Sequence, residues 1–445
     1  MKLLESEEHP LDRHLGWLYD RVTGEEDARV CKDIPESACR HQPRNFFAYL
    51  VANSATKVAD ELSSARLILP WLLAAVGAPM ALVGFLVPIR EAGVLLPQLM
   101  VAAVVRRMAR RKAVWLVGAL LSAVSLVLMA AIAWQFEGVL AGSLLIGCLI
   151  VYSLARGLCS VSAKDVLGKT VSKTRRGTLM GYASGISGLS VFALGVYLVL
   201  AQSPDDDTMQ LSLFLLMAAL LWLLGLLCFA TITEAPGATE GGGNAFTVAI
   251  KQLAIIKTDR YFRSFLWARA WLLSIALLPP FYVVLVQQTG GSILGLGGMI
   301  IASGLAASIS APIWGKLSDR SSRWVMMLAA SISAVLGMGL WLLDRLHDID
   351  QNLAWLMIGA YFILMICHGG VRLGRKAYLV DMATSDNRAS YVAVSNTVIG
   401  LVMLGGGLVG VLGDIWSTVS VIGLLSGLAL VAMIQLYTLP EVQRS

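Results

Sequence analysis

Three carboxylic acids lie well inside the apolar runs of this sequence, where they could take up and release protons. Asp60 and Glu61 follow Lys57 by one helical turn, and Glu91 follows Arg90 in the next run. Charge in such a run is costly, so each group must face a partner or a wet cavity. A carboxylate among apolar neighbours can accept a proton near neutral pH. We therefore predict Asp60 and Glu61 as proton-coupling groups, with Glu91 in reserve. Because adjacent residues of a helix point in different directions, Arg90 and Glu91 are expected to bond to different helices.

Basic residues form a second set, spread over four apolar runs: Lys57, Arg156, Arg269 and Arg372. The last run also holds His368, four residues before Arg372, so that both lie on one helical stripe. A guanidinium suits bidentate contact with a carboxylate or phosphate, so interior arginines favour an anionic ligand. His368 could titrate, although a lone histidine in such a run is more often a hydrogen-bonded packing residue.

The composition places these residues in an integral membrane protein. Of 445 residues, 57% are hydrophobic and 14% charged, and the mean hydropathy is +0.72, whereas a soluble domain is about a quarter charged. Residues 1–14 are polar, without the apolar core of a cleavable signal peptide, so the first span is expected to direct insertion.

Apolar runs and their breakers predict an all-α protein with twelve transmembrane helices, since strands at barrel period are not seen. The first six spans are predicted at 48–74, 79–104, 113–134, 141–165, 178–201 and 210–232, and the last six at 262–286, 292–314, 324–344, 353–378, 390–412 and 417–437. The first span is the most charged, and its alternative is a surface helix followed by a shorter span from Leu67.

The chain repeats itself weakly at an offset of 212 residues. Lys57 matches Arg269, and Arg111 matches Arg323, without a gap. Internal repeats of this kind are characteristic of secondary transporters. We predict an N-terminal tail at 1–47, a six-helix half at 48–232, a glycine-rich linker at 233–261 and a second six-helix half at 262–445.

Basic residues between the spans predict the orientation. They gather in alternate loops, whereas the opposite loops hold acidic groups such as Asp205, Asp206 and Asp207. By the positive-inside rule, both termini are expected in the cytoplasm of a multi-pass protein of the cytoplasmic, or inner, membrane. The net charge of +6 then reflects this asymmetry and anionic lipid headgroups, not a nucleic-acid partner.

One loop carries a family resemblance. Residues 315–323 read Gly-Lys-Leu-Ser-Asp-Arg-Ser-Ser-Arg, which resembles the Gly-x-Leu-x-Asp-Arg-x-x-Arg signature of the major facilitator superfamily. Arg156-Gly157 is similar to a second element of that family. At the aligned positions of the first half, 103–111, neither the glycine nor the aspartate is present. The resemblance implies two six-helix pseudo-repeats and a conformational latch formed by Gly315, Asp319, Arg320 and Arg323.

The resemblance also implies where the solute binds. In this family the first, fourth, seventh and tenth helices line a central cavity, and here they carry the four basic residues named above. We therefore expect the substrate-binding residues to be Lys57, Arg156, Arg269, His368 and Arg372. The alternative for basic residues at helix ends is a role in topology or in salt bridges between the halves.

These features predict a secondary active transporter that works by alternating access, with proton coupling, on a small to medium organic solute, foremost an organic anion. Proton-driven efflux of drugs and other amphiphiles is the alternative, and a non-transporting sensor or assembly scaffold of the same fold is a second. No nucleotide-binding loop or hydrolytic constellation is seen, so no enzymatic activity, cofactor or metal is expected. The expected partners are the solute, a proton or other coupling ion and membrane lipids, with a monomer favoured.

Overall fold

The computed structural model describes residues 10–23, 39, 41–95, 108–201, 207–236, 253–289, 293–346, 354–383 and 388–443. Within these ranges the chain is helical and contains no strand. Ten of the described helical segments are long and apolar enough to cross a membrane. The predicted all-α membrane fold is therefore confirmed.

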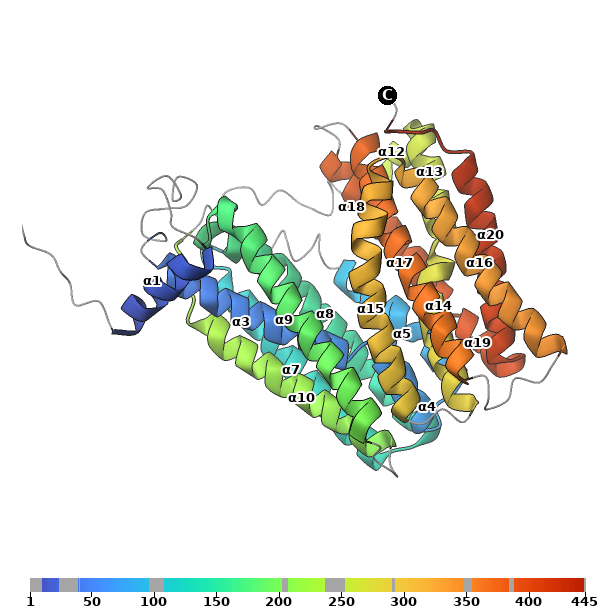
Figure 1. Ribbon diagram of the computed structural model, residues 1–445, viewed down its shortest axis with the longest axis horizontal. Helices are drawn as coiled ribbons and strands as arrows, with labels where there is room; N and C mark the ends of the chain where they lie inside the picture. Colours follow the sequence, from blue (N-terminus) through green and yellow to red (C-terminus); the bar gives the residue numbers. More distant parts are fainter. Residues whose placement is uncertain are drawn as a thin grey trace, which may run out of the picture.

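The helices form two bundles that lie side by side and diverge toward the top of Figure 1. The first bundle consists of α3 (Gln42–Leu62), α4 (Ile68–Ala75), α5 (Met80–Leu95), α7 (Lys112–Gln135), α8 (Gly138–Thr170), α9 (Lys173–Ala201) and α10 (Asp207–Ala230), with α1 (Pro10–Thr23) docked on α3. The second consists of α12 (Ile255–Thr258), α13 (Arg260–Trp271), α14 (Leu273–Gln288), α15 (Ile293–Ser318), α16 (Ser322–Leu346), α17 (Ala354–Met382), α18 (Arg388–Gly406), α19 (Val409–Ile415) and α20 (Thr418–Tyr437).

The first span differs from its prediction as one helix over 48–74. It begins earlier, at Gln42, and breaks between α3 and α4. Ser63 ends α3 by donating its backbone N–H and its hydroxyl to the carbonyl of Ala59, at 3.1 and 2.7 Å, and Leu69 begins the next turn by donating to the Ser64 carbonyl. The break leaves Arg66 in a turn beside the centre of the bundle. The second predicted span is α5 to Leu95, and its remainder lies outside the described residues.

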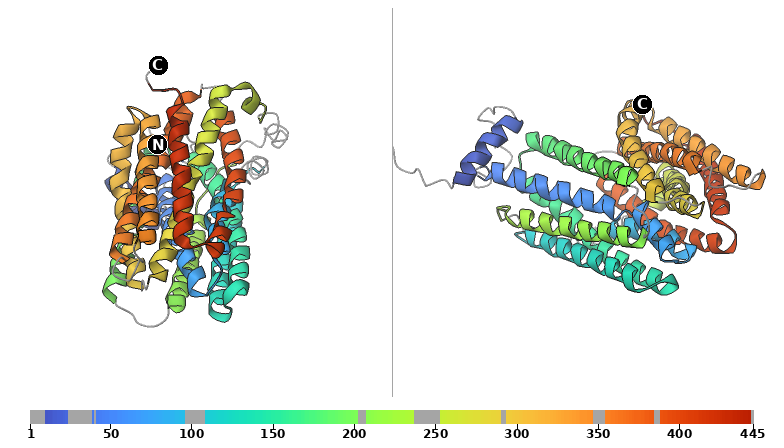
Figure 2. Two further views of the ribbon diagram at one scale, coloured as in Figure 1. Left: turned by 90° about the vertical axis from the view of Figure 1, so that its right-hand side faces the viewer. Right: turned by 60° about the horizontal axis from the view of Figure 1, so that its bottom comes forward.

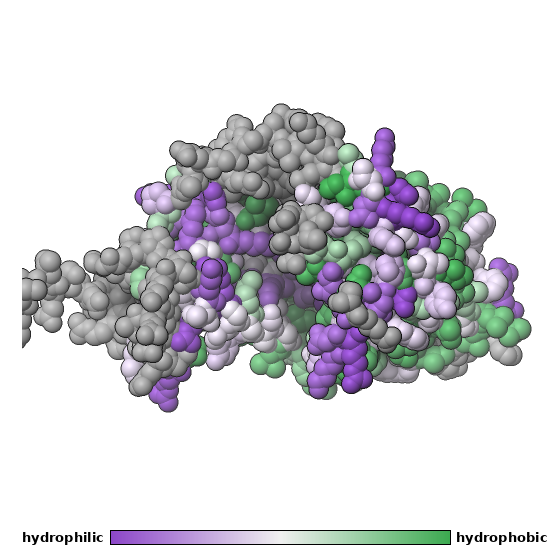
Figure 3. All heavy atoms as spheres, turned by 90° about the horizontal axis from the view of Figure 1, so that it is seen from above, coloured by the Kyte–Doolittle hydropathy of each residue, from purple (hydrophilic) through white to green (hydrophobic). Residues whose placement is uncertain are grey.

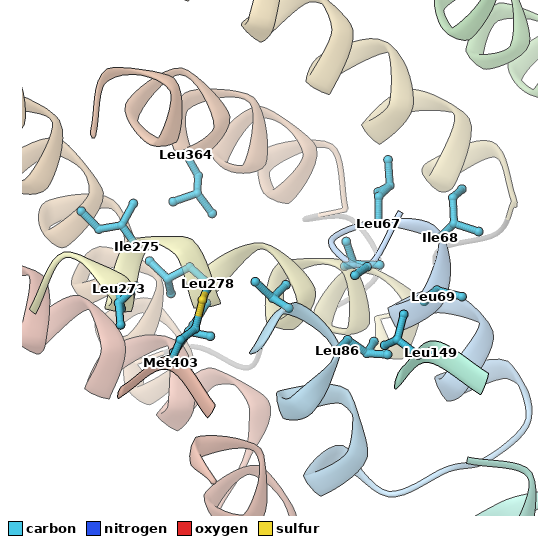
Figure 4. Packing of buried hydrophobic residues seen from close by; sticks show 14 of the residues in the cluster. Leu67, Ile68, Leu69, Leu86, Leu149, Leu273, Ile275, Leu278, Leu364 and Met403 are labelled. Carbon is cyan, nitrogen blue, oxygen red and sulfur yellow. The ribbon is translucent and has the colours of Figure 1, made fainter. Parts of the chain in front are cut away.

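The bundles bury an apolar core that continues across their interface. Helix α14 contacts both α4 and α5 of the other bundle. Figure 4 shows Leu86 near Leu149 in the first bundle and Leu278 near Met403 in the second. Both views in Figure 2 show the helices of each bundle running roughly alongside one another. Side chains on the outside are mostly apolar, as a lipid-facing surface requires.

The two ends of the molecule differ in how closely the bundles approach. We call the end near α1 and the C-terminus the terminal side and the opposite end the far side. On the far side, α5 crosses α18 and α19, and α9 crosses α15. Seen from the terminal side, hydrophilic residues surround a hollow between the bundles (Figure 3).

Glycines allow backbone contact at the far-side crossings. A Cβ atom on Gly84 would lie 2.5 Å from the Gly407 carbonyl oxygen, and one on Gly410 would lie 2.6 Å from the Met80 carbonyl oxygen. At the crossing of α9 and α15, a Cβ on Gly297 would lie 3.1 Å from the Gly195 carbonyl oxygen. Small residues let membrane helices pack at such short range. The far side is therefore closed by direct contact of main chains.

A carboxylate completes this closure. Asp414, near the end of α19, accepts hydrogen bonds from the backbone N–H groups of Met80 and Ala81, at 2.7 and 2.8 Å. These groups begin α5 and have no partner within that helix. A residue of the second bundle thus caps a helix of the first, which stabilises the closed far side.

We expect Gly410→Leu to lower the melting temperature of the purified protein, because the new side chain must push α5 and α19 apart. Overpacking of this kind costs about 1–3 kcal/mol. Gly339→Leu on α16 is the matched control, since no atom lies within 4 Å of a Cβ built there. Equal melting temperatures for the two variants would contradict close main-chain packing at the far side.

Candidate functional site

A cavity of about 340 Å³ lies between the bundles, at the size expected for a small-molecule site. Its charged and titratable lining comes from α3, α5, α8, α17 and the turn after α3: Asp60, Glu61, Arg66, Arg90, Glu91, Arg156, His368 and Arg372. Smaller residues, including Ser303 and Ser310 of α15, line the remainder. Six of the predicted site residues are therefore brought together: Asp60, Glu61, Glu91, Arg156, His368 and Arg372.

Asp60 is shared by two arginines. Arg90 Nη2 lies 2.9 Å from Asp60 Oδ1, and the Arg156 guanidinium bonds to Oδ2. The Tyr152 hydroxyl donates a third hydrogen bond to Oδ1, at 2.9 Å. The bonds to the two guanidiniums are charge-assisted and stronger than bonds between neutral groups. Asp60 therefore joins α3, α5 and α8, and the cluster of three side chains carries a net positive charge.

Glu91 is paired separately. Arg66 Nη2 lies 2.5 Å from Glu91 Oε1, so this pair is neutral overall. Arg90 bonds to α3 and Glu91 to the turn that follows α3, so the two residues have different partners, but these do not lie on different helices as was predicted. Arg66 and Arg90 were not predicted as lining residues. The only signal for Arg66 was its position in the charged first span, and that for Arg90 was its place beside Glu91.

Two charged groups that line the cavity have no hydrogen bond or ion pair with any described residue. Glu61 belongs to the first bundle and Arg372 to the second, and both side chains are exposed. His368 lies one turn from Arg372 and is buried. A solute in the cavity would therefore meet one unpaired carboxylate and one unpaired guanidinium, on opposite walls.

The structure does not bring the other two predicted binding residues into this cavity. Arg269 is buried and donates hydrogen bonds to the side chains of Ser395 and Asn396, the latter at 3.0 Å, so it holds α13 against α18. Lys57 donates to the Ser184 hydroxyl at 2.6 Å and lines a neighbouring lateral space. The positions of Lys57 and Arg269 on the first and seventh helices were a poor guide to the lining of the cavity, because neither side chain points toward its centre.

The predicted latch is not assembled as expected. A Cβ on Gly315 would meet no atom within 4 Å, and among the described residues the Asp319 and Arg320 side chains make no hydrogen bond or ion pair. Arg323 donates to the Leu439 carbonyl at 2.5 Å and lies 3.6 Å from Glu441, both in its own bundle. The bundles diverge on the terminal side, and none of these four residues makes a hydrogen bond or ion pair with a described residue of the other bundle.

Sequence reasoning missed Glu234, which binds Arg111 and Lys112 at the end of the first-half segment that aligns with the signature loop. Its carboxylate accepts from the backbone N–H groups of Arg111 and Lys112, at 2.9 and 2.7 Å, and from Lys169 Nζ at 3.0 Å. The side chain is only 1% exposed. Arg111 also pairs with Asp165. An acidic residue directly after the sixth apolar run was the available signal.

The second half repeats this device with different residues. Ser321 donates its hydroxyl to Glu441 and Ser322 its backbone N–H to Gln443, each at 2.5 Å. In both halves, side chains that follow the last helix cap the start of the third. The capping of the third helix is therefore common to both halves, whereas the signature loop is complete only in the second half.

Comparisons with known proteins agree with this architecture. The sequence model of the Major Facilitator Superfamily matches residues 270–445, and solved structures of that type superpose on most of the chain. The chain has the major facilitator fold. The resemblance drawn from the signature loop is thereby confirmed. No curated protein matches the chain by sequence.

Three solved structures illustrate the similarity of this major facilitator fold. A mutant of the nucleoside transporter NupG superposes with a TM-score of 0.70 at 11% identity, over 88% of this chain and 99% of that one. A POT family transporter in complex with a thioalcohol conjugated peptide gives 0.67 at 13%, over 91% and 98%. The inward open xylose transporter XylE from E. coli gives 0.62 at 15%, over 89% and 97%. Each of these three proteins is a transporter.

We expect Asp60→Asn to lower the free energy of unfolding by about 3 kcal/mol, because it leaves two guanidiniums without their carboxylate. This value is at the lower end of the range usual for a broken buried ion pair, because the side chains of Asp60, Arg90 and Arg156 are still 16–23% exposed. A denaturant titration in detergent micelles measures the change. Glu61→Gln is the control, with an effect within about 0.5 kcal/mol. A loss as large in the control would refute the shared role of Asp60.

We expect Glu234→Ala to lower the free energy of unfolding by about 2 kcal/mol, because two backbone N–H groups and Lys169 lose their acceptor. Asp319→Ala in the signature loop should change it by less than about 0.5 kcal/mol. The same denaturant titration compares them. A larger effect at Asp319 would place the stabilising contact in the signature loop instead.

Proposed function

We propose that this protein is a proton-coupled secondary transporter of organic anions that works by alternating access. The observation that carries the proposal is the unpaired guanidinium of Arg372 in a cavity between two bundles. Charge in a membrane interior is retained at a high energetic cost and is therefore a functional signal. A planar guanidinium suits a carboxylate or phosphate better than any other solute group.

The charge balance of the cavity supports an anionic solute. Four arginines face three carboxylates there, and the pair of Arg90 and Arg156 on Asp60 already leaves one positive charge in excess. Arg372 adds a further charge that only Glu61 offsets. A bound anion would restore neutrality in a region of low dielectric, where uncompensated charge is most costly.

Glu61 is the best candidate for proton coupling. Asp60 and Glu91 are bonded to arginines, whereas Glu61 has no such partner among the described side chains. Protonation of Glu61 would raise the positive charge of the cavity and strengthen anion binding. By reciprocity, a bound anion would strengthen proton binding to the same degree. This linkage is the thermodynamic basis of symport.

The arrangement of the bundles supports alternating access. The far side is closed by glycine contacts and by Asp414, whereas the terminal side is open. Residues such as Arg110, Arg111 and Lys112 give the terminal side its positive charge, so we assign it to the cytoplasm, with both termini there and the protein in the cytoplasmic membrane. The structure would then be the inward-facing state, and rocking of the two halves would expose the cavity on the other side.

Closure of the terminal side is the step at which the predicted latch would act. Gly315, Asp319 and Arg320 have open surroundings in this state and are available for contact. The predicted linker at 233–261 lies outside the described residues over 237–252. Arg323 would remain bound to the C-terminal segment throughout, because its partners belong to its own half.

A second candidate function is efflux of cationic amphiphiles. The observation in its favour is that Glu61 borders both the central cavity and an apolar lateral space. An unpaired carboxylate beside apolar walls suits a ligand with a cationic head and an apolar body. The excess of arginines in the cavity opposes such a ligand, which is why the anion is preferred.

We expect reconstituted protein to take up labelled organic anions in proteoliposomes when an inward proton gradient is imposed. Arg372→Ala should reduce gradient-driven uptake at least tenfold, because a charge-assisted contact contributes about 1.5–3 kcal/mol. Glu61→Gln should abolish the dependence on the gradient while leaving exchange of anion for anion. Arg260→Ala, an exposed arginine at the start of α13, is the matched control and should behave as the parent protein.

Other outcomes separate the alternatives. Gradient-driven movement of organic cations that survives Arg372→Ala but not Glu61→Gln would favour efflux of amphiphiles. Absence of flux for every anion and cation, in protein that keeps its melting temperature, would favour a non-transporting sensor or scaffold.

A further inference from the structure

A second space, which we call the lateral slot, opens from the side of the central cavity between α9 and α15. Its volume is about 690 Å³. The slot shares Asp60, Glu61, Leu67, Ser303 and Ala307 with the central cavity, so the two spaces adjoin at these residues. The slot ends toward the far side at the crossing of Gly195 and Gly297.

The charged residues of the slot lie on one wall. Lys57, Asp60 and Glu61 lie at the inner end, on α3. The residues that α9 and α15 contribute are uncharged, with apolar side chains such as Leu189 and Leu305 beside glycines and serines. Leu189 and Leu305 are 71% and 43% exposed, as are many apolar side chains of the lipid-facing surface. The slot therefore leads from a charged wall on α3 to the uncharged residues of α9 and α15.

Small residues keep the slot open. A Cβ atom on Gly185, Gly188 or Gly304 would meet no atom within 4 Å. These glycines are not explained by close packing, unlike Gly195 and Gly297, whose Cβ positions are occupied by the opposite helix. The space beside them is wide enough to be filled by a chain of methylene groups.

We propose that the lateral slot binds the apolar tail of an amphiphilic anion whose charged head lies at Arg372. This inference rests on the proposed function and narrows its substrate class to single-chain amphiphiles, such as alkyl phosphates or long-chain carboxylates. Lys57, held by Ser184 at the inner end, adds a second positive charge near the junction of head and tail.

The charged inner end argues against a purely apolar occupant. A hydrocarbon chain alone would remove water from Lys57 and Glu61 without offering a hydrogen bond, which is unfavourable. An amphiphile places its polar head where the slot is charged and its tail where the slot is apolar. Each methylene buried from water is expected to strengthen binding up to about fourfold.

The test is competition by ethyl, butyl, hexyl and octyl phosphate against uptake of a labelled short-chain organic phosphate in proteoliposomes. In the parent protein, the inhibition constant should fall by at least about tenfold from ethyl to octyl phosphate. In Gly304→Leu and Gly185→Leu, which fill the slot, this fall should shrink to less than about threefold, with ethyl phosphate unaffected. Gly147→Leu, on the open outer face of α8, is the matched control and should keep the full dependence.

Comparison between variants removes the effect of partitioning into the bilayer, since partitioning depends on the ligand and not on the variant. A chain-length dependence that is the same in Gly304→Leu and in the parent protein would overturn the inference. In that event, transport of ethyl phosphate would still support the proposed function.

A binding measurement keeps the inference testable without transport. Thermal stabilisation of protein in lipid nanodiscs should rise with chain length of the phosphate, and the rise should be lost in Gly304→Leu. If no anion is transported, the proposed function fails, whereas the slot is still judged by this stabilisation. Stabilisation by octyl ammonium but not by octyl phosphate would contradict the anionic head.

Discussion

The Asp60 carboxylate joins three helices in the interior of the membrane bundle, and the remaining charges of the cavity are arranged around it. Arg90 and Arg156 are turned toward Asp60, and the Tyr152 hydroxyl completes its hydrogen bonds. Because Arg90 is committed in this way, its neighbour Glu91 points elsewhere and meets Arg66. Glu61 is then left without a partner in the described part of the chain. The paired carboxylate of Asp60 and the unpaired carboxylate of Glu61 are thus adjacent in sequence but differ in their surroundings.

The interface between the bundles has two unequal ends, as the proposed alternating access requires. The main-chain contact at Gly84 and Gly410 requires the two helices to lie close together. It is lost as a whole when they separate. The bonds from Met80 and Ala81 to Asp414 are lost in the same movement. Contacts within each bundle, such as those of Glu234 and Arg323, do not depend on the interface. The contacts within each bundle and the contacts between the bundles are therefore made by different residues.

The sequence predicted the helices well because long apolar runs leave few alternatives in a membrane. Thus α7, α16 and α20 begin and end within about two residues of their predicted spans. The prediction of one unbroken first span was wrong. Ser63 can end a helix only where the surrounding bundle makes room for the break, and the sequence alone does not show that room. Arg269 was expected to line the cavity, but it bonds to Ser395 instead. The internal repeat predicts which helix carries the residue and not which side of that helix faces the cavity. The role of each candidate residue in transport stays a prediction.

The position of Asp60 also bears on how the chain enters the membrane during synthesis. Its two arginine partners come 30 and 96 residues later in the chain. Helix α3 is therefore made before either of these partners, and it is not among the described helical segments apolar enough to cross a bilayer alone. The ion pairs that join α3, α5 and α8 through Asp60 can form only once α8 has been translated, after most of the first bundle has been made.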